Sequence, residues 1–205
     1  MSSPEELQKL GSPVYWDDIY RSGGSHEWFK SFSQLEPFLR KKLTPTDLNP
    51  LLLHLGCGDS TLPQDLLALG YTEQVCVDFS ETVIEQMRSQ CPDLDWRVED
   101  VRNLTSADSA FHFAIDKGTL DAMIWGSNWD PPQDVRDNIR RYVDEVARVM
   151  KPGGRWIYVT FRQPHFMRTH LTREEVWDID IEMLQDERGT FEYFAYVMTR
   201  KMGTI

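Results

Sequence analysis

A short apolar run that ends in a glycine turn constrains the fold of this chain more than any other feature. The run is Leu51–Leu55, and the turn that follows contains Gly56 and Gly58. Such a run is typical of a strand buried on both faces of a parallel sheet, and the glycines permit a tight turn that a ligand can approach closely. Leucines then recur at helical spacing from 62 to 69, before Gly70. The segment therefore predicts a strand, a binding turn and a helix.

Strand-like and helix-like segments alternate along the rest of the chain. Ser80 is expected to cap one helix. A longer helix is expected to run through Ile139 and Met150 and to end at Lys151-Pro152-Gly153-Gly154. Further buried strands are expected over residues 74–77, 94–98, 111–115 and 155–161. This alternation is the pattern of successive strand–helix–strand units.

The last two strand-like segments, 176–184 and 191–199, alternate apolar and polar residues around a turn-prone stretch at 186–189. They predict an antiparallel pair that closes the sheet. The chain is thus predicted to adopt an α/β, Rossmann-like fold with helices on both faces of a seven-stranded, mostly parallel sheet and a C-terminal antiparallel hairpin. Because no repeat or long linker interrupts the pattern, residues 1–205 are expected to form a single domain.

Composition limits the partners that this domain can have. The chain has 205 residues, of which 40% are hydrophobic and 27% charged, so it can bury a substantial core. Its formal net charge of -11 argues against nucleic acid as a partner, because non-specific binding to phosphates depends on clustered lysine and arginine. A basic protein or a small cation suits this charge better, and a monomer is expected.

Cytoplasm is the expected location. No apolar stretch approaches the roughly 18 residues that span a bilayer, so no membrane association is expected. The N-terminal residues lack the pattern of a secretory signal or a transit peptide. The three cysteines form no CxxC pair, which favours a reducing compartment. None of the five histidines has metal-ligand spacing, and no metal is expected.

A carboxylate completes the binding turn. Asp78 lies twenty residues after Gly58, at the end of the next predicted strand, where it can accept hydrogen bonds from ribose hydroxyls. The third glycine position of a dinucleotide fingerprint is Thr61, which leaves less room for a pyrophosphate. S-adenosylmethionine carries no phosphate and fits better. Asp100 can accept from an adenine amino group beside Val101, although a solvated acidic loop is an alternative explanation for this pair.

The sequence resembles the seven-β-strand protein-lysine methyltransferases of the elongation factor 1-alpha and citrate synthase group. The motifs that carry the resemblance are Gly56-Cys57-Gly58-Asp59-Ser60, Asp78-Phe79-Ser80, Asp100-Val101 and, above all, Asp116-Lys117-Gly118-Thr119-Leu120-Asp121. The likeness covers nearly the whole chain, from Tyr15-Trp16-Asp17-Asp18-Ile19-Tyr20 to Pro164-His165-Phe166. It implies an N-terminal lid and helical segment over residues 1–45 and a core over 50–205.

The resemblance also implies a role for particular residues around S-adenosylmethionine. Aromatic faces attract a sulfonium cation and stack on adenine by about 0.5–2 kcal/mol. The implied cofactor contacts are Trp16, Tyr20 and Trp28 in the lid, Gly56 and Gly58 in the floor, Asp78 and Phe79 at the ribose and adenine, and Asp100, Val101 and Lys117 as further walls. Ordinary helix packing is the alternative for the three lid aromatics, and an ion pair with Asp116 is the alternative for Lys117.

The catalytic and substrate residues are less sharply defined. Methyl transfer from a sulfonium needs alignment and a deprotonated amine, for which Asp116, Asp121 and Glu27 are candidate helpers. Each of these carboxylates is also a normal structural residue. The candidates for substrate contact are Trp125, Trp129, His165 and Phe166, for which burial or helix capping is an equally good explanation.

The leading functional hypothesis is methylation of a lysine side chain in a protein. Elongation factor 1-alpha is the best substrate candidate, since the acidic N-terminus argues against mitochondrial import and so against citrate synthase. Two rivals remain open: a small-molecule methyltransferase with a closed apolar pocket, and a non-catalytic adaptor that retains the fold. The sequence does not identify the target residue or the number of methyl groups added.

Overall fold

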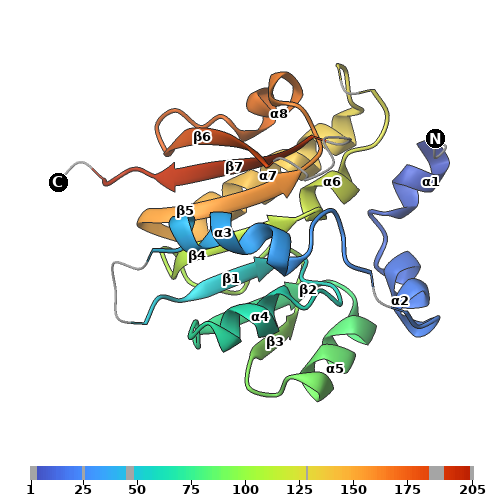
Figure 1. Ribbon diagram of the computed structural model, residues 1–205. Coiled ribbons are helices and arrows are strands. Elements are labelled where there is room, and N and C mark those ends of the chain that lie inside the picture. The colour runs from blue at the N-terminus through green and yellow to red at the C-terminus, as the bar shows by residue number, and fades with distance from the viewer. Residues whose placement is uncertain (1–3, 25, 45–48, 128, 185–191, 204–205) are drawn as a thin grey trace.

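Seven strands form one mixed sheet in the order β3-β2-β1-β4-β5-β7-β6 (Figure 1). This computed structural model describes residues 4–24, 26–44, 49–127, 129–184 and 192–203. The strands are β1 (Leu52–Leu55), β2 (Gln74–Asp78), β3 (Asp95–Val98), β4 (Phe111–Lys117), β5 (Met150–Thr160), β6 (Trp177–Leu184) and β7 (Tyr193–Arg200). Only β7 runs against its neighbours, because β5 and β6 both pair with it in antiparallel register while the remaining pairs are parallel. The predicted Rossmann-like sheet with its C-terminal antiparallel hairpin is confirmed.

Helices cover both faces of the sheet, as predicted. The helices are α1 (Pro4–Lys9), α2 (Pro13–Arg21), α3 (Phe32–Lys42), α4 (Leu62–Ala68), α5 (Glu81–Gln90), α6 (Thr119–Met123), α7 (Gln133–Val149) and α8 (Pro164–Leu171). Successive strand residues point to opposite faces. In β1, Leu53 and Leu55 pack with α6, α7 and α8, whereas Leu52 packs with α3 and α4. A third cluster joins α2 and α5 over Cys76.

The local sequence explains most of these elements. The strands β1 and β2 are buried along their whole length, as the apolar runs predicted. Ser80 caps α5 by accepting a hydrogen bond from the amide of Val83 at 3.3 Å. The sequence patterns did not predict α3, although Ser31 and Gln34 form a capping box at its start. Since α3 packs against the sheet, it belongs to the core layer and not to a lid.

Some predicted boundaries were wrong. Met150 was expected in a helix, but it pairs with Phe111 and begins β5, with a register shift before Arg155 joins the ladder opposite Phe113. The fourth strand was expected to stop at 115, yet β4 continues to Lys117. The predicted hairpin turn at 186–189 and the strand start at 191 lie outside the described residues.

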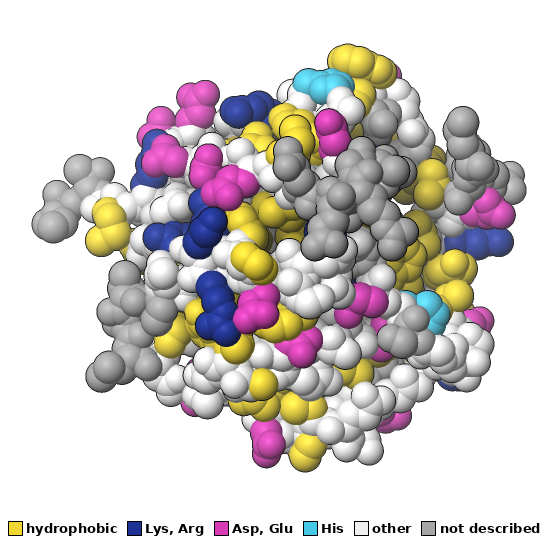
Figure 2. Space-filling model, in the orientation of Figure 1, with side chains coloured by type: hydrophobic (Ala, Val, Ile, Leu, Met, Phe, Trp, Pro, Cys, Tyr) yellow, Lys and Arg dark blue, Asp and Glu magenta, His cyan; other side chains and the backbone are white. Residues whose placement is uncertain are grey.

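The topology itself fixes where a ligand can bind. Within the sheet, β2 and β3 lie on one side of β1, and β4 and β5 lie on its other side. The strand order therefore reverses between β1 and β4, and open α/β sheets bind ligands in the crevice at the carboxyl ends of such strands. The helices α1 and α2 lie beyond these strand ends (Figure 1). Within the described residues, no helix is long and apolar enough to cross a membrane. On the face shown in Figure 2, acidic and basic side chains are interspersed with hydrophobic ones.

Candidate functional site

In the turn after β1, neighbouring side chains lie very close to the backbone. Gly56 and Gly58 have φ angles of 63° and 51°, in the left-handed region that favours glycine. A Cβ atom on Gly56 would lie 2.2 Å from Oγ1 of Thr119, and one on Gly58 would lie 2.8 Å from the hydroxyl oxygen of Tyr20. Thr119 is held in place because its hydroxyl donates to the carbonyl of Leu55 at 2.7 Å. Both glycines are therefore required by conformation and by space.

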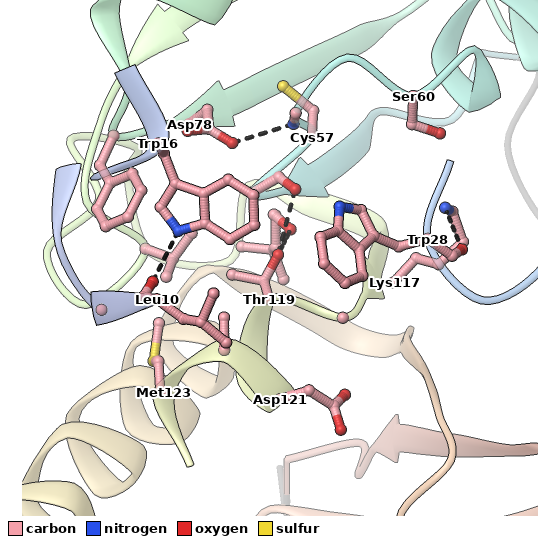
Figure 3. Close-up of a pocket in the computed structure, with 18 of the residues that line it drawn as sticks. Leu10, Trp16, Trp28, Cys57, Ser60, Asp78, Lys117, Thr119, Asp121 and Met123 are labelled. Carbon is pink, nitrogen blue, oxygen red and sulfur yellow. Dashed lines mark hydrogen bonds between the residues drawn. The ribbon is translucent and has the colours of Figure 1, made fainter. Parts of the chain in front are cut away.

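A cavity of about 730 Å³ opens over this turn, within the range of small-molecule sites. Figure 3 shows this cavity, in which Trp16 and Trp28 lie over the ends of the central strands. Its wall comes from the strand ends and the turns that follow them, from α1, α2 and α6, and from the segment before α3. All ten residues for which the sequence predicted cofactor contact line this one cavity: Trp16, Tyr20, Trp28, Gly56, Gly58, Asp78, Phe79, Asp100, Val101 and Lys117.

Asp78 is the last residue of β2 and is only 6% exposed. One carboxylate oxygen accepts from the amide of Gly58 at 3.0 Å, and the other accepts from the amide of Ser80 at 2.9 Å. Burial raises the pKa of Asp78 to about 6, although these backbone hydrogen bonds lower it. Each oxygen retains a lone pair, so the carboxylate can still accept from two hydroxyl groups.

Asp100 has a partner that the sequence analysis did not foresee. Its two oxygens receive the guanidinium of Arg102 as a fork, with Nε at 2.9 Å and Nη2 at 2.6 Å. The Asp100 carboxyl is half-buried, and despite that burial the hydrogen bonds from Arg102 hold its pKa below the usual value. Val101 is 5% exposed and supplies an apolar wall beside it. An adenine amino group that contacts Asp100, as predicted, would share this carboxylate with the guanidinium of Arg102.

Aromatic side chains cover the cavity from the lid, which we define as residues 13–24 and 26–30. Trp16 stacks on Tyr20 with ring centroids 5.8 Å apart and meets Trp28 edge to face at the same separation. The indole nitrogen of Trp16 donates to the carbonyl of Leu10 at 2.7 Å, which fixes the ring over the cavity (Figure 3). Asp17 accepts the Ser80 hydroxyl at 2.5 Å and so joins α2 to the start of α5.

Lys117 ends β4 and reaches across to the lid. Its ammonium pairs with the carboxylate of Glu27 and donates to the carbonyl of Trp28 at 2.8 Å. Glu27 also accepts from the Ser60 hydroxyl at 3.1 Å. The alternative ion pair between Lys117 and Asp116 is wrong, because adjacent strand residues point to opposite faces of the sheet. Glu27, which the sequence offered only as a candidate proton acceptor, is the actual partner of Lys117.

The two predicted catalytic carboxylates lie in different environments. Asp116 is fully buried outside the cavity wall, where it caps α6 at the amides of Thr119 and Leu120 and accepts the Tyr142 hydroxyl at 2.8 Å. Burial raises the pKa of Asp116 to about 7. These contacts give Asp116 a structural role and no access to the cavity.

Asp121 does line the cavity, on the opposite side of Thr119 from the lid tryptophans (Figure 3). It accepts from the hydroxyls of Tyr158 and Thr160 at 2.8 and 2.7 Å and from Nε of Arg162 at 3.0 Å. Burial raises the pKa of Asp121, and the nearby Arg162 opposes that shift. One acceptor position on the carboxylate oxygen that faces Tyr158 remains available.

The four residues predicted to contact substrate divide into two groups. Trp125 lines the cavity. Trp129, His165 and Phe166 form an aromatic cluster outside the cavity wall, in which the Trp129 ring centroid lies 5.7 Å from His165 and 4.8 Å from Phe166. Trp129 is 80% exposed, which is unusual for so large an apolar side chain.

Sequence reasoning missed several residues that shape the cavity. Arg162 pairs with Asp121 and also donates to the carbonyl of Ile124 at 2.9 Å. Phe29 lies against Gly118 and meets Phe161 edge to face with centroids 5.5 Å apart. These contacts join distant segments, so no local pattern could have indicated them. The described residues contain no group of three or more histidine, cysteine or acidic side chains arranged to hold a metal ion.

Comparison with known proteins decides the family. Residues 53–158 match the model of a methyltransferase domain. A mouse protein named "EEF1A lysine methyltransferase 4" is 32% identical over 203 residues, which cover 95% of this chain and 78% of the relative. The chain belongs to the class I S-adenosylmethionine-dependent methyltransferases. Its cofactor is therefore S-adenosylmethionine.

Other relatives of this methyltransferase support the same grouping. A bovine "eEF1A lysine and N-terminal methyltransferase" is 29% identical over 96% of this chain, which corresponds to 30% of that larger protein. A solved structure from echinomycin biosynthesis, titled for the conversion of a disulfide bond into a thioacetal group, has a TM-score of 0.71 at 18% identity and covers 94% of both chains. At that identity the structural likeness concerns the fold alone.

The cavity of the methyltransferase fits its cofactor on physical grounds. Gly56 and Gly58 line the cavity without a side chain, and the buried Asp78 retains two acceptor positions for the ribose. The lid tryptophans offer π faces to adenine or to a sulfonium. A dinucleotide would need groups for a pyrophosphate that the turn does not provide.

Proposed function

We propose that this methyltransferase modifies a lysine side chain of a protein, with elongation factor 1-alpha as the best substrate candidate. The names of the similar mouse and bovine proteins support this substrate class. The observation that carries the proposal is the extent of the cavity, which continues past Thr119 to Asp121, Trp125 and Phe161. Since Phe161 is 41% exposed, this end offers a side chain from another protein a path to the methyl group.

The chemistry assigns a task to each part of the cavity. S-adenosylmethionine supplies a methyl group on a sulfonium sulfur, and the attacking amine must lie in line with the bond that breaks. We propose that the ten cavity residues predicted from the sequence bind the cofactor: Trp16, Tyr20, Trp28, Gly56, Gly58, Asp78, Phe79, Asp100, Val101 and Lys117. Free lysine has a pKa of about 10.4, so its ammonium has to lose a proton before it can attack.

Asp121 is the better of the two candidate carboxylates for contact with that lysine. Its remaining acceptor position supports the assignment, whereas the hydrogen bonds that Asp116 accepts come from the start of α6 and from Tyr142. Asp121 would orient the incoming amine, and the proton would leave through the open end of the cavity. An Asp121→Asn variant is expected to lower kcat more than tenfold while S-adenosylhomocysteine affinity changes less than twofold, measured by initial rates and calorimetry. Equal rates for variant and wild type would remove Asp121 from the mechanism.

The exposed cluster of Trp129, His165 and Phe166 is proposed to contact the substrate protein beside the entrance. Trp125 of the cavity wall and Trp129 lie in the same connection between α6 and α7, which joins this cluster to the entrance. Exposed, mutually packed aromatic side chains are typical of binding surfaces. The net charge of -11 adds attraction for a basic partner.

We further propose that the chain acts as a single-domain, cytoplasmic monomer without nucleic-acid or membrane partners, as the composition suggests. The decisive experiment for substrate class uses methyl-labelled S-adenosylmethionine and a cytosolic extract, followed by mass spectrometry. Label is expected on a lysine of elongation factor 1-alpha, and Asp78→Ala enzyme serves as the matched control. Label on metabolites alone would favour the small-molecule alternative, and no label with intact cofactor binding would favour the adaptor.

A further inference from the structure

The ion pair between Lys117 and Glu27 joins two segments that lie ninety residues apart. The Lys117 side chain is only 6% exposed, so its charge has lost most of its contact with water. A buried ammonium needs a compensating charge and hydrogen-bond acceptors. Glu27 supplies the charge and the carbonyl of Trp28 supplies an acceptor. The end of β4 therefore depends on the lid for its electrostatic balance.

The backbone next to this ion pair is strained. Phe29 has a φ of 62°, which bulky side chains rarely adopt. The carbonyl of Trp28 accepts from the amide of Lys30 at 2.8 Å across Phe29, closing a tight three-residue turn, and the same carbonyl accepts from Lys117. Such strain persists only where surrounding contacts enforce it. Lys117 thus fixes the carbonyl at the turn, and with it the position of the Trp28 side chain.

A second contact of Glu27 reaches the glycine turn. Its carboxylate accepts from the hydroxyl of Ser60, which follows the turn and is itself close enough to accept from the amide of Leu62 at 3.3 Å. Beside it, the amide of His26 donates to Asp59 at 2.9 Å. Glu27 consequently contacts both strands that flank the cofactor crevice, through Lys117 at the end of β4 and through Ser60 beyond the turn that follows β1.

We propose that Glu27 is a positioning residue that holds the lid closed over the bound cofactor. By pairing with Lys117 and accepting from Ser60, it sets Trp28 as a wall of the cavity and slows release of the cofactor product. Glu27 is not among the residues that line the cavity, and its carboxylate is engaged by Lys117 and Ser60, which distinguishes this role from that of a proton acceptor. The inference rests on the cofactor and is independent of which molecule receives the methyl group.

The test is the dissociation of S-adenosylhomocysteine, followed by stopped-flow tryptophan fluorescence and by calorimetry. Glu27→Gln keeps the size of the side chain and an acceptor for Ser60 but removes the charge. The dissociation rate is expected to rise about tenfold with little change in the association rate, because the pair acts after the lid has closed. Asp18→Asn is the matched control, since the exposed Asp18 carboxylate pairs with exposed Arg21 on the outer side of α2.

A double-mutant cycle separates positioning from general stabilisation. Once Lys117→Met has removed the partner, adding Glu27→Gln is expected to accelerate dissociation less than twofold further. Ser60→Ala, which keeps the ion pair, is expected to accelerate dissociation about threefold. Melting temperatures without ligand verify that each variant is folded. A Glu27→Gln dissociation rate within twofold of wild type, or full additivity with Lys117→Met, would overturn the proposal.

Discussion

The floor and the lid of the cofactor cavity are built in different ways. The floor consists of strand ends and the glycine turn, where β1 and β2 are wholly buried and each contact is repeated along a hydrogen-bonded ladder. The lid is held at separate points, through Asp17 at Ser80, Glu27 at Lys117 and the indole of Trp16 at Leu10. A floor of this kind is rigid because its neighbours fix it from all sides, whereas the lid packs against α5 through Trp16 and Tyr20 and is otherwise held by these polar contacts.

The largest expected effect comes from disturbing the floor. Gly56→Ala places a methyl group against Thr119 in a left-handed backbone, and such strain and overpacking cost about 2–4 kcal/mol. We expect the free energy of unfolding to fall by this amount and cofactor affinity to drop more than a hundredfold, measured by urea denaturation and calorimetry. Gly70→Ala is the control, because Gly70 has a φ of 94° but open space around its Cβ position. Equal effects of both substitutions would mean that close approach at Gly56 is unimportant.

Removing an aromatic face of the lid is expected to have the next largest effect. Trp16→Leu keeps an apolar side chain but loses contacts with Tyr20, Trp28 and the ligand, of about 1–2 kcal/mol in total. The affinity for S-adenosylhomocysteine should fall about tenfold to thirtyfold in a calorimetric titration, and the melting temperature of the free protein should also fall, because Trp16 is buried in the cluster that joins α2 and α5. Val14→Ala on the exposed side of α2 should leave the affinity as it is. An unchanged affinity in Trp16→Leu would show that the lid does not touch the ligand.

The pH dependence of cofactor affinity tests the floor through the titration of Asp78. Because the pKa of Asp78 is raised to about 6, its carboxylate is ionised at pH 7 and largely protonated at pH 5. Ribose hydroxyls favour the ionised form, so affinity should decrease about tenfold from pH 7 to pH 5. Asp78→Asn, which carries no titrating group, should bind weakly at both values with a flat profile. A wild-type profile that is also flat would mean that this carboxylate does not receive the ribose.

The smallest effect is expected where the lid meets α5. Asp17→Asn removes the charge of the carboxylate that accepts from Ser80 and from the amide of Thr82, but leaves the aromatic contacts in place. We expect about a threefold loss of cofactor affinity, because Asn keeps an oxygen acceptor for these hydrogen bonds. A hundredfold loss would place the principal attachment of the lid at α5 and not at Lys117.

The same comparison explains what could be predicted from sequence. The floor could be predicted because its signals are local: an apolar run, a glycine turn, and Asp78 twenty residues after Gly58. The lid aromatics were found through resemblance, but their polar contacts were not, since Glu27 meets Ser60 across 33 residues and Lys117 across 90. No periodicity records contacts between such distant segments.

Asp116 illustrates a second limit. Its place beside Lys117 suggested chemistry, but the pleat of β4 turns the two side chains to opposite faces and buries Asp116 under α7 against Tyr142. The strand β4 ends two residues later than predicted. Only this observed end shows which of the two residues faces the cavity. The different environments of Asp121 and Asp116 could be distinguished only from the position of α6 in the structure.

The most direct test of the account is a calorimetric titration of S-adenosylmethionine into wild-type and Asp78→Ala protein at pH 7.5. Wild-type protein is expected to bind one equivalent, and the variant, which loses both ribose acceptors, is expected to bind at least a hundredfold more weakly while retaining its fold by circular dichroism. Equal affinities in the two proteins would contradict the placement of the nucleoside above the ends of β1 and β2.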